Sequence, residues 1–232
     1  MKEIRDPDQF VQYIQKHQLE SIFNDKLISY MTLYRFDQGE LICSQGDSSE
    51  YLYILVKGKV KIYTTTAEGR ALILSFKPPL ELIGDVEYVQ GIDIINTVEA
   101  VSPVHMILIH YQWIKKFGHN DPVFLNFLLE IITRKFCVKS NSLSFNLLYP
   151  VEVRLASYLL SVSFDESDNQ FKGQLSTLSL KDTANLIGTS YRHLNRVIQK
   201  FSKEGLVERK KGFLHVKNRE GLKEIADHNI YE

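Results

Sequence analysis

The 232-residue sequence has few cysteines, no excess of either charge and no long apolar run. Its two cysteines, Cys43 and Cys137, stand far apart, so they indicate no disulfide framework and cannot alone ligate an iron–sulfur cluster. The residues after Met1 lack the apolar core of a signal peptide, and no stretch approaches the length of a membrane span. We therefore expect a cytoplasmic protein with no membrane partner, metal or cofactor.

The motifs of common enzyme classes are also missing. The chain has no Gly-x-Ser-x-Gly, no His-Glu-x-x-His and no Gly-x-x-x-x-Gly-Lys phosphate loop. Asp85 and Glu87 are two residues apart, but neither a histidine nor a nucleophile stands beside them in sequence, so we expect them to rim a loop. The sequence predicts that the protein is not an enzyme.

Two short helical patterns separated by Gly188 lie near the end of the chain. Leu180, Ala184 and Ile187 recur at helical spacing before the glycine, and Leu194, Val197, Ile198 and Phe201 do so after it. Gly188 can adopt the positive φ that ends a helix, and Thr189 or Ser190 can cap the next one. This arrangement predicts a helix-turn-helix, in which the second helix enters the DNA major groove. Residues 207–216 follow as a predicted two-stranded wing.

The side chains left on the open face of the second helix suit DNA. Arginine and asparagine can read guanine and adenine edges, and lysine suits phosphate. We predict five base-reading residues: Tyr191, Arg192, His193, Asn195 and Arg196. We predict five phosphate contacts: Ser190, Lys200, Lys203, Lys210 and Lys211.

The distribution of charge supports this interpretation. Residues 181–219 contain ten lysines and arginines against three acids, a net charge of +7, although the whole chain is neutral. A solvated helical hairpin, or a helix-turn-helix that contacts protein, would not need such a concentration of charge. The alternative is a cyclic-nucleotide or other small-ligand-binding module that acts through protein contact.

The first half of the chain differs from the second in pattern. Short strands punctuated by glycine turns run from residue 30 to 109 and predict a β-roll or jelly roll. A long apolar helix then begins at Pro122 and runs to about Asn146. Its length favours a parallel homodimer seam over a helix buried within one subunit. We predict six residues for that seam: Phe124, Phe127, Leu128, Ile131, Val138 and Phe145.

The fold class is therefore predicted as α+β with three parts. They are N-terminal helices and a β-roll (1–118), a long dimerisation helix and hinge (119–149), and a winged helix-turn-helix (150–232). In this order the parts resemble the Crp/Fnr family of bacterial transcription regulators. The runs Ser190–Leu194 and Lys211–Leu214 look most like its YeiL-type branch. The resemblance implies a homodimer on near-palindromic double-stranded DNA and allows a contact with RNA polymerase.

The resemblance also places a candidate effector loop. In nucleotide-binding members, a Gly-Glu pair opens a loop that ends in Arg-Ser, where the glutamate holds the ribose and the arginine pairs with the cyclic phosphate. The corresponding residues here are Gly84 and Asp85, then Ile94 and Ile95. A phosphate buried against two isoleucines would lack its counter-charge. We predict a degenerate pocket that does not bind cyclic AMP, and the sequence names no other effector.

Overall fold

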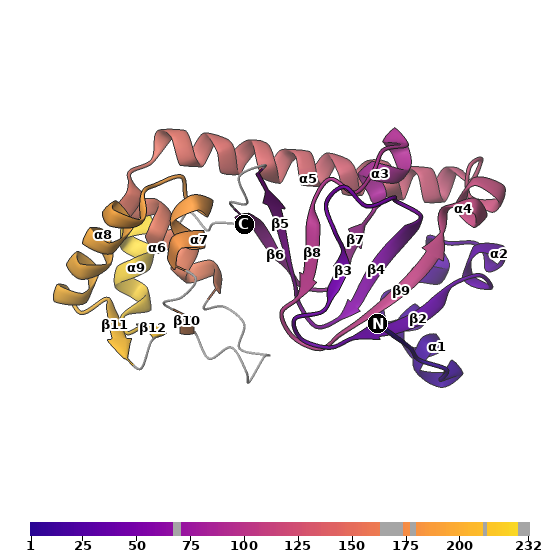
Figure 1. Cartoon of the computed structure of the whole chain (residues 1–232), viewed down its shortest axis with the longest axis horizontal. Helices are drawn as coiled ribbons and strands as arrows, with labels where there is room; N and C mark the ends of the chain where they lie inside the picture. Colours follow the sequence, from indigo (N-terminus) through magenta and orange to yellow (C-terminus); the bar gives the residue numbers. More distant parts are fainter. Residues whose placement is uncertain (67–70, 163–173, 177–179, 211–212, 227–232) are drawn as a thin grey trace. The chain divides into compact units, whose positions relative to one another are not determined.

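The structure is a computed structural model that describes residues 1–66, 71–162, 174–176, 180–210 and 213–226 (Figure 1). The chain divides into two compact units, Met1–Phe136 and Cys137–Glu232. This division falls inside one long helix, α5 (Pro122–Leu148), whereas the sequence predicts a separate connecting part over 119–149. Among the described helices, none combines the length and apolar character needed to cross a membrane.

The first unit is built on two antiparallel sheets, with the strand orders β1-β2-β9-β4-β7 and β3-β8-β5-β6. The strands are β1 (Lys2–Glu3), β2 (Thr32–Phe36), β3 (Leu41–Cys43), β4 (Tyr51–Lys57), β5 (Val60–Thr65), β6 (Ala71–Lys77), β7 (Glu81–Ile83), β8 (Thr97–Ala100) and β9 (Val104–His110). The helices are α1 (Pro7–Lys16), the 3-10 turn η1 (Leu19–Ser21), α2 (Asp25–Ile28), α3 (Asp85–Gln90), α4 (Tyr111–Phe117) and the first part of α5. The predicted β-roll is confirmed.

Strand β4 explains how this unit is held together, because both of its faces are buried. Leu52 and Ile54 pack with the helices in one cluster, whereas Leu55 packs in a second cluster with residues of both sheets. A strand covered on both sides carries a continuous apolar run rather than strict alternation, and Leu52–Val56 does so. The first cluster extends to Phe124 of α5, which is fully buried.

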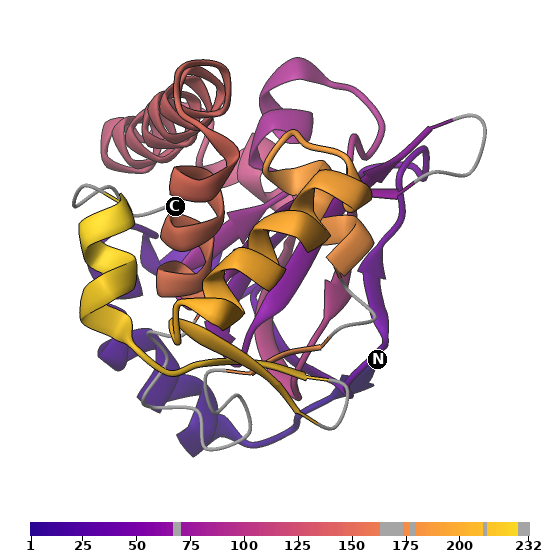
Figure 2. The same cartoon turned by 90° about the vertical axis from the view of Figure 1, so that its left-hand side faces the viewer.

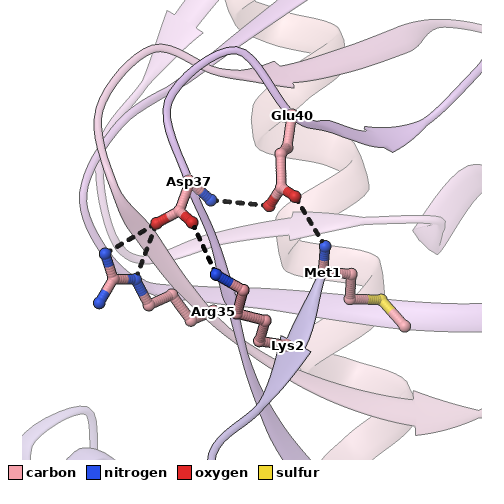
Figure 3. A network of polar contacts seen from close by, with 5 residues as sticks. All are labelled: Met1, Lys2, Arg35, Asp37 and Glu40. Atoms are coloured by element: carbon pink, nitrogen blue, oxygen red, sulfur yellow. Dashed lines mark hydrogen bonds and ion pairs between the residues drawn. The ribbon is translucent and has the colours of Figure 1, made fainter.

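A polar network fastens β1 to the edge of the first sheet (Figure 3). Asp37 accepts hydrogen bonds from Arg35 Nη2 at 2.7 Å and from Lys2 Nζ at 3.3 Å. Glu40 accepts from the Met1 amino group and from the Asp37 backbone N–H. These donors lower the pKa of both carboxyl groups, because they favour the charged form.

In its described residues the second unit contains the rest of α5 and four further helices: α6 (Val151–Val162), α7 (Leu180–Leu186), α8 (Tyr191–Lys203) and α9 (Arg219–Ala226). Its sheet has the order β10-β12-β11, from β10 (Gln174–Ser176), β11 (Val207–Lys210) and β12 (Phe213–Val216). Figures 1 and 2 both show the helices α6 to α9 on one side of the β11–β12 hairpin. The core joins all four helices through Leu159, Leu180, Phe201 and Leu222.

Candidate nucleic-acid interface

The turn between α7 and α8 is set by Gly188, as predicted. Its φ is +64°, and the N–H of Thr189 bonds back to Ala184 O at 2.8 Å while that of Gly188 bonds to Asn185 O at 3.1 Å. This pair of bonds is a Schellman motif, which ends a helix on a left-handed residue. An added Cβ at Gly188 would also lie 3.1 Å from Arg154 Nη1. Both backbone conformation and space therefore favour glycine here.

Arg154 of α6 supports the same turn from inside the domain. Its side chain is buried, and Nη1 donates to the carbonyl oxygens of Ile187 and Gly188. Carbonyls at the end of a helix lack intrahelical partners, so a buried guanidinium both satisfies them and fixes the angle between the helices. Sequence reasoning missed this role, because nothing in the spacing of Arg154 links it to Gly188.

Helix α8 begins at a side-chain cap. The Ser190 hydroxyl oxygen accepts the His193 backbone N–H at 3.1 Å, which confirms one of the two predicted caps. Leu194, Val197, Ile198 and Phe201 are buried, as predicted from their spacing. The inward face is therefore fixed by packing, and the opposite face is available to a ligand.

The predicted base-reading residues divide by exposure. Tyr191 is 44% exposed, and Arg192 and Arg196 are exposed too, whereas His193 and Asn195 are half-buried. The Asn195 amide is bonded within the domain at both ends, to Tyr191 O at 3.0 Å and to Arg209 of β11. Arg209 was not among the predicted site residues.

Four of the five predicted phosphate contacts lie at the ends of α8 and on β11. Lys203 and Lys210 are exposed. Lys200 is exposed as well and makes a long ion pair of 4.0 Å with Glu152. Ser190 serves as the helix cap, and Lys211 lies outside the described residues.

The loop corresponding to the predicted effector pocket is held by contacts within the first unit. Gly84 has a φ of +87°, and Tyr111 donates its hydroxyl to Gly84 O at 2.6 Å. Both carboxylate oxygens of the buried Asp85 lie 3.0 Å from Lys135 Nζ on α5. The same ammonium contacts Leu82 O at 2.6 Å and Glu81 Oε1 at 2.8 Å. Burial would lower the pKa of Lys135, but Asp85 and Glu81 outweigh it, and the pKa is raised.

The two isoleucines at the expected phosphate position point to different surroundings. Ile94 is buried in the β-roll core, and Ile95 is 42% exposed. The backbone N–H of Ile95 donates to Glu87 Oε1 at 3.2 Å. The Glu87 carboxylate therefore already accepts a hydrogen bond from this loop, which makes the site less suited to an anion.

The two cysteines lie in contrasting environments. Cys43 is buried, and burial together with Glu87 raises its pKa to about 12, whereas Cys137 on α5 is exposed. Among the described residues, no cluster of three histidine, cysteine or acidic side chains is placed to hold a metal ion.

Helix α5 packs on the β-roll of its own subunit with part of the face that was predicted for the dimer seam. Phe124, Leu128 and Ile131 are buried in the first core cluster, where Phe127 packs against them half-buried. Val138 and Phe145 are half-buried. The large apolar side chains of α5 left in solvent include Leu129, Phe136 and Leu143, which are 64%, 71% and 63% exposed, besides Val123 and Leu125 near its start and Leu147 and Leu148 at its end. The sequence pattern alone could not separate the two faces, because α5 is apolar nearly all round.

Two family models match the chain in the order that the fold suggests. The cyclic nucleotide-binding domain matches residues 33–121, and the Crp-like helix-turn-helix domain matches residues 153–225. These segments correspond to the sheets of the first unit and to the helices around Gly188.

Whole-length relatives agree with this order. The regulatory protein YeiL of Escherichia coli O157:H7 is 27% identical over 212 residues, covering 89% of this chain and 93% of YeiL. The cyclic AMP receptor protein of Thermus thermophilus is 26% identical, over 87% and 91% of the two chains. A crystal structure of a CRP/FNR-family regulator from the same species superimposes with a TM-score of 0.70 at 20% identity, over 85% of this chain and 99% of that one. The relatives are regulators rather than enzymes, and this chain belongs to the Crp/Fnr family of transcription regulators, with a DNA-binding helix-turn-helix.

Proposed function

We propose that the protein is a homodimeric, sequence-specific transcription regulator whose β-roll controls DNA binding without cyclic AMP. The observation that carries the DNA-binding mode is the exposed face of α8. Ser190 caps the helix, four apolar residues anchor it, and Arg192 and Arg196 remain in solvent on its first two turns. The N-terminal half of such a helix is the part that meets base edges in helix-turn-helix proteins.

In this proposal Tyr191, Arg192, His193 and Arg196 face the bases. The exposed lysines at positions 200, 203 and 210 lie further along α8 and on β11, where they suit phosphate. Lys200 would exchange its long contact with Glu152 for a phosphate oxygen. A bidentate arginine–guanine pair contributes about 1–3 kcal/mol of discrimination against other bases.

A dimer seam along α5 is supported by its unburied apolar side chains. Leu129, Phe136 and Leu143 recur every seven residues, the repeat by which two helices pair along one seam. Leaving three such side chains in water is unfavourable, since burial of one contributes about 1.5–3 kcal/mol. We propose this line in place of Phe124, Leu128 and Ile131, which pack within their own subunit.

The absence of cyclic AMP binding is supported by the effector loop. No cation stands at positions 94 and 95, and the Asp85 carboxylate that would meet a ribose is bonded to Lys135. The relative from T. thermophilus is named as a cyclic AMP receptor protein, but this chain has Ile94 and Ile95 where the arginine–serine pair is expected. The Lys135 ammonium group therefore holds the candidate effector loop to α5 through Asp85.

The experiment is selection of binding sites from random duplex DNA by the purified protein, without added ligand, at about 150 mM salt. Enrichment of a two-fold-symmetric site with half-sites about 34 Å apart is expected. Failure to enrich any sequence, with or without a metabolite extract, would favour a small-ligand-binding module that acts through protein contact.

A further inference from the structure

The side chain of Asn195 connects the recognition helix to the wing. Its Nδ2 donates to the Tyr191 carbonyl oxygen at 3.0 Å, and its Oδ1 accepts from Arg209 Nη2. A carbonyl can only accept and a guanidinium can only donate, so these two partners fix the orientation of the amide. Reading adenine in bidentate fashion would require the same two ends of the amide.

The position of Arg209 in β11 explains how it reaches α8. Val207 is buried and Arg209 is two residues later, on the same side of the strand. Glu208, on the other side, pairs with Lys217 at 3.7 Å. The alternation of the strand thus separates the arginine from the nearest acid in sequence and directs it to the helix.

No acidic side chain among the described residues pairs with Arg209. Within the part of the chain that the structure describes, the one polar interaction of its side chain is with the neutral Asn195 amide. An arginine paired with a carboxylate has its charge neutralised, whereas one held by an amide keeps it. The guanidinium has five donors, and most of them are left for an anion.

We propose that Arg209 contacts a DNA phosphate beside the recognition helix and that Asn195 is a positioning residue that holds it there. This inference rests on DNA binding by α8 and assigns Asn195 a role other than base reading. Holding the guanidinium before DNA arrives reduces the side-chain ordering that binding would otherwise require. The basic surface then continues from Arg192 and Arg196 across to the wing.

The test is a double-mutant cycle with Arg209→Ala and Asn195→Ala, measured on the selected site and on an unrelated duplex. Arg209→Ala should weaken binding to both duplexes by a similar factor, roughly tenfold, because phosphate is common to all sequences. The slope of log affinity against log salt should fall by about 0.9. Asn195→Ala should weaken binding without relaxing any base preference, and it should have no effect once Arg209 is alanine.

Lys223→Ala on α9 is the matched control, because it removes the same charge from a partly exposed lysine that is paired with Glu220. It should leave the affinity and the salt slope unchanged. Additive losses in the cycle, with relaxed preference at one base in Asn195→Ala, would show that Asn195 reads DNA directly and overturn the inference. An unchanged salt slope in Arg209→Ala would overturn it as well. Binding of both duplexes without a preferred site would count against sequence specificity alone, and the cycle on either duplex would still decide the role of Arg209.

Discussion

Arg196 lies on the second turn of α8 and on its exposed face, although Leu194 and Val197, close to it in sequence, are buried. The described residues give its side chain no polar partner, in contrast to Asn195. We expect Arg196→Ala to cost about 1–3 kcal/mol on the best site and to relax the preference at one base pair. Binding to a panel of single-base variants measures both effects. An equal loss on every sequence would instead assign Arg196 to phosphate.

Asp37 and Glu40 give the protein a pH-sensitive attachment of β1. Their pKa values are lowered from ordinary values of 3.8 and 4.5, so their contribution is complete above those values and is lost as the pH falls through the lower folded-state pKa. The network is exposed, so the effect on global stability should be small. Carbon NMR titration should place the Asp37 midpoint below 3.8, and Asp37→Asn should speed amide exchange at Lys2 and Glu3 at neutral pH. A midpoint at or above 3.8 would contradict the network.

At the scale of elements, Lys135 is the link between α5, β7 and α3. Its side chain is 29% exposed, and the Asp85 side chain that it contacts is 4% exposed. Lys135→Met would leave a buried carboxylate without its partner, so we expect a loss of about 3 kcal/mol, at the lower end for a buried pair because the ammonium is partly solvated. The single tryptophan, Trp113 on α4, reports unfolding of this unit in urea.

Pairing Lys135→Met with Asp85→Asn provides the control. The second change removes the charge that the first leaves unpaired, so the double variant should recover part of the loss. A single variant as stable as the wild type would indicate that solvent, rather than Lys135, satisfies Asp85.

The exposed line on α5 makes a separate prediction. Phe136→Glu places a charge in the proposed seam, and we expect a monomer in analytical ultracentrifugation with unchanged helical content, because Phe136 is 71% exposed within one chain. Asn141→Glu, on the exposed opposite side of the heptad, is the matched control and should remain dimeric. A wild-type protein that sediments as a monomer would contradict the seam.

Local patterns predicted these elements better than they predicted side-chain partners. The Gly188 turn, the Ser190 cap and the strand-forming runs depend on neighbours in sequence, and the structure confirms them. The face of α5 that packs on the β-roll depends on the shape of a distant sheet, so six apolar positions could not be sorted. The contacts Arg154–Ile187 and Lys135–Asp85 join residues far apart in the chain, and no periodicity encodes them.

For the whole molecule, the contacts of the effector loop predict that cyclic AMP changes neither the thermal stability nor the DNA affinity of the protein. A ligand present at about 100 times its dissociation constant stabilises the folded state by about 2.7 kcal/mol, which raises the Tm of a chain of this size by about 5–10 °C. We expect no shift with millimolar cyclic AMP and no change in DNA affinity. The T. thermophilus relative named as a cyclic AMP receptor protein is the positive control. A reproducible rise in Tm would overturn the proposed degenerate pocket.

The charge distribution has a consequence at the same scale. The chain is neutral, and residues 181–219 carry +7, so the rest must be net negative. DNA should therefore attract the helix-turn-helix and repel the remainder, which limits unspecific coating.

The contrast between the two cysteines has a practical consequence. A maleimide probe reacts with thiolate, so the buried Cys43, with its pKa raised to about 12, should be spared while the exposed Cys137 is modified. The natural sequence thus accepts one spin label or fluorophore per chain, directly after Phe136. If two copies pair along α5, the distance between their labels becomes a ruler, and pulsed electron resonance could follow the pair as DNA is added.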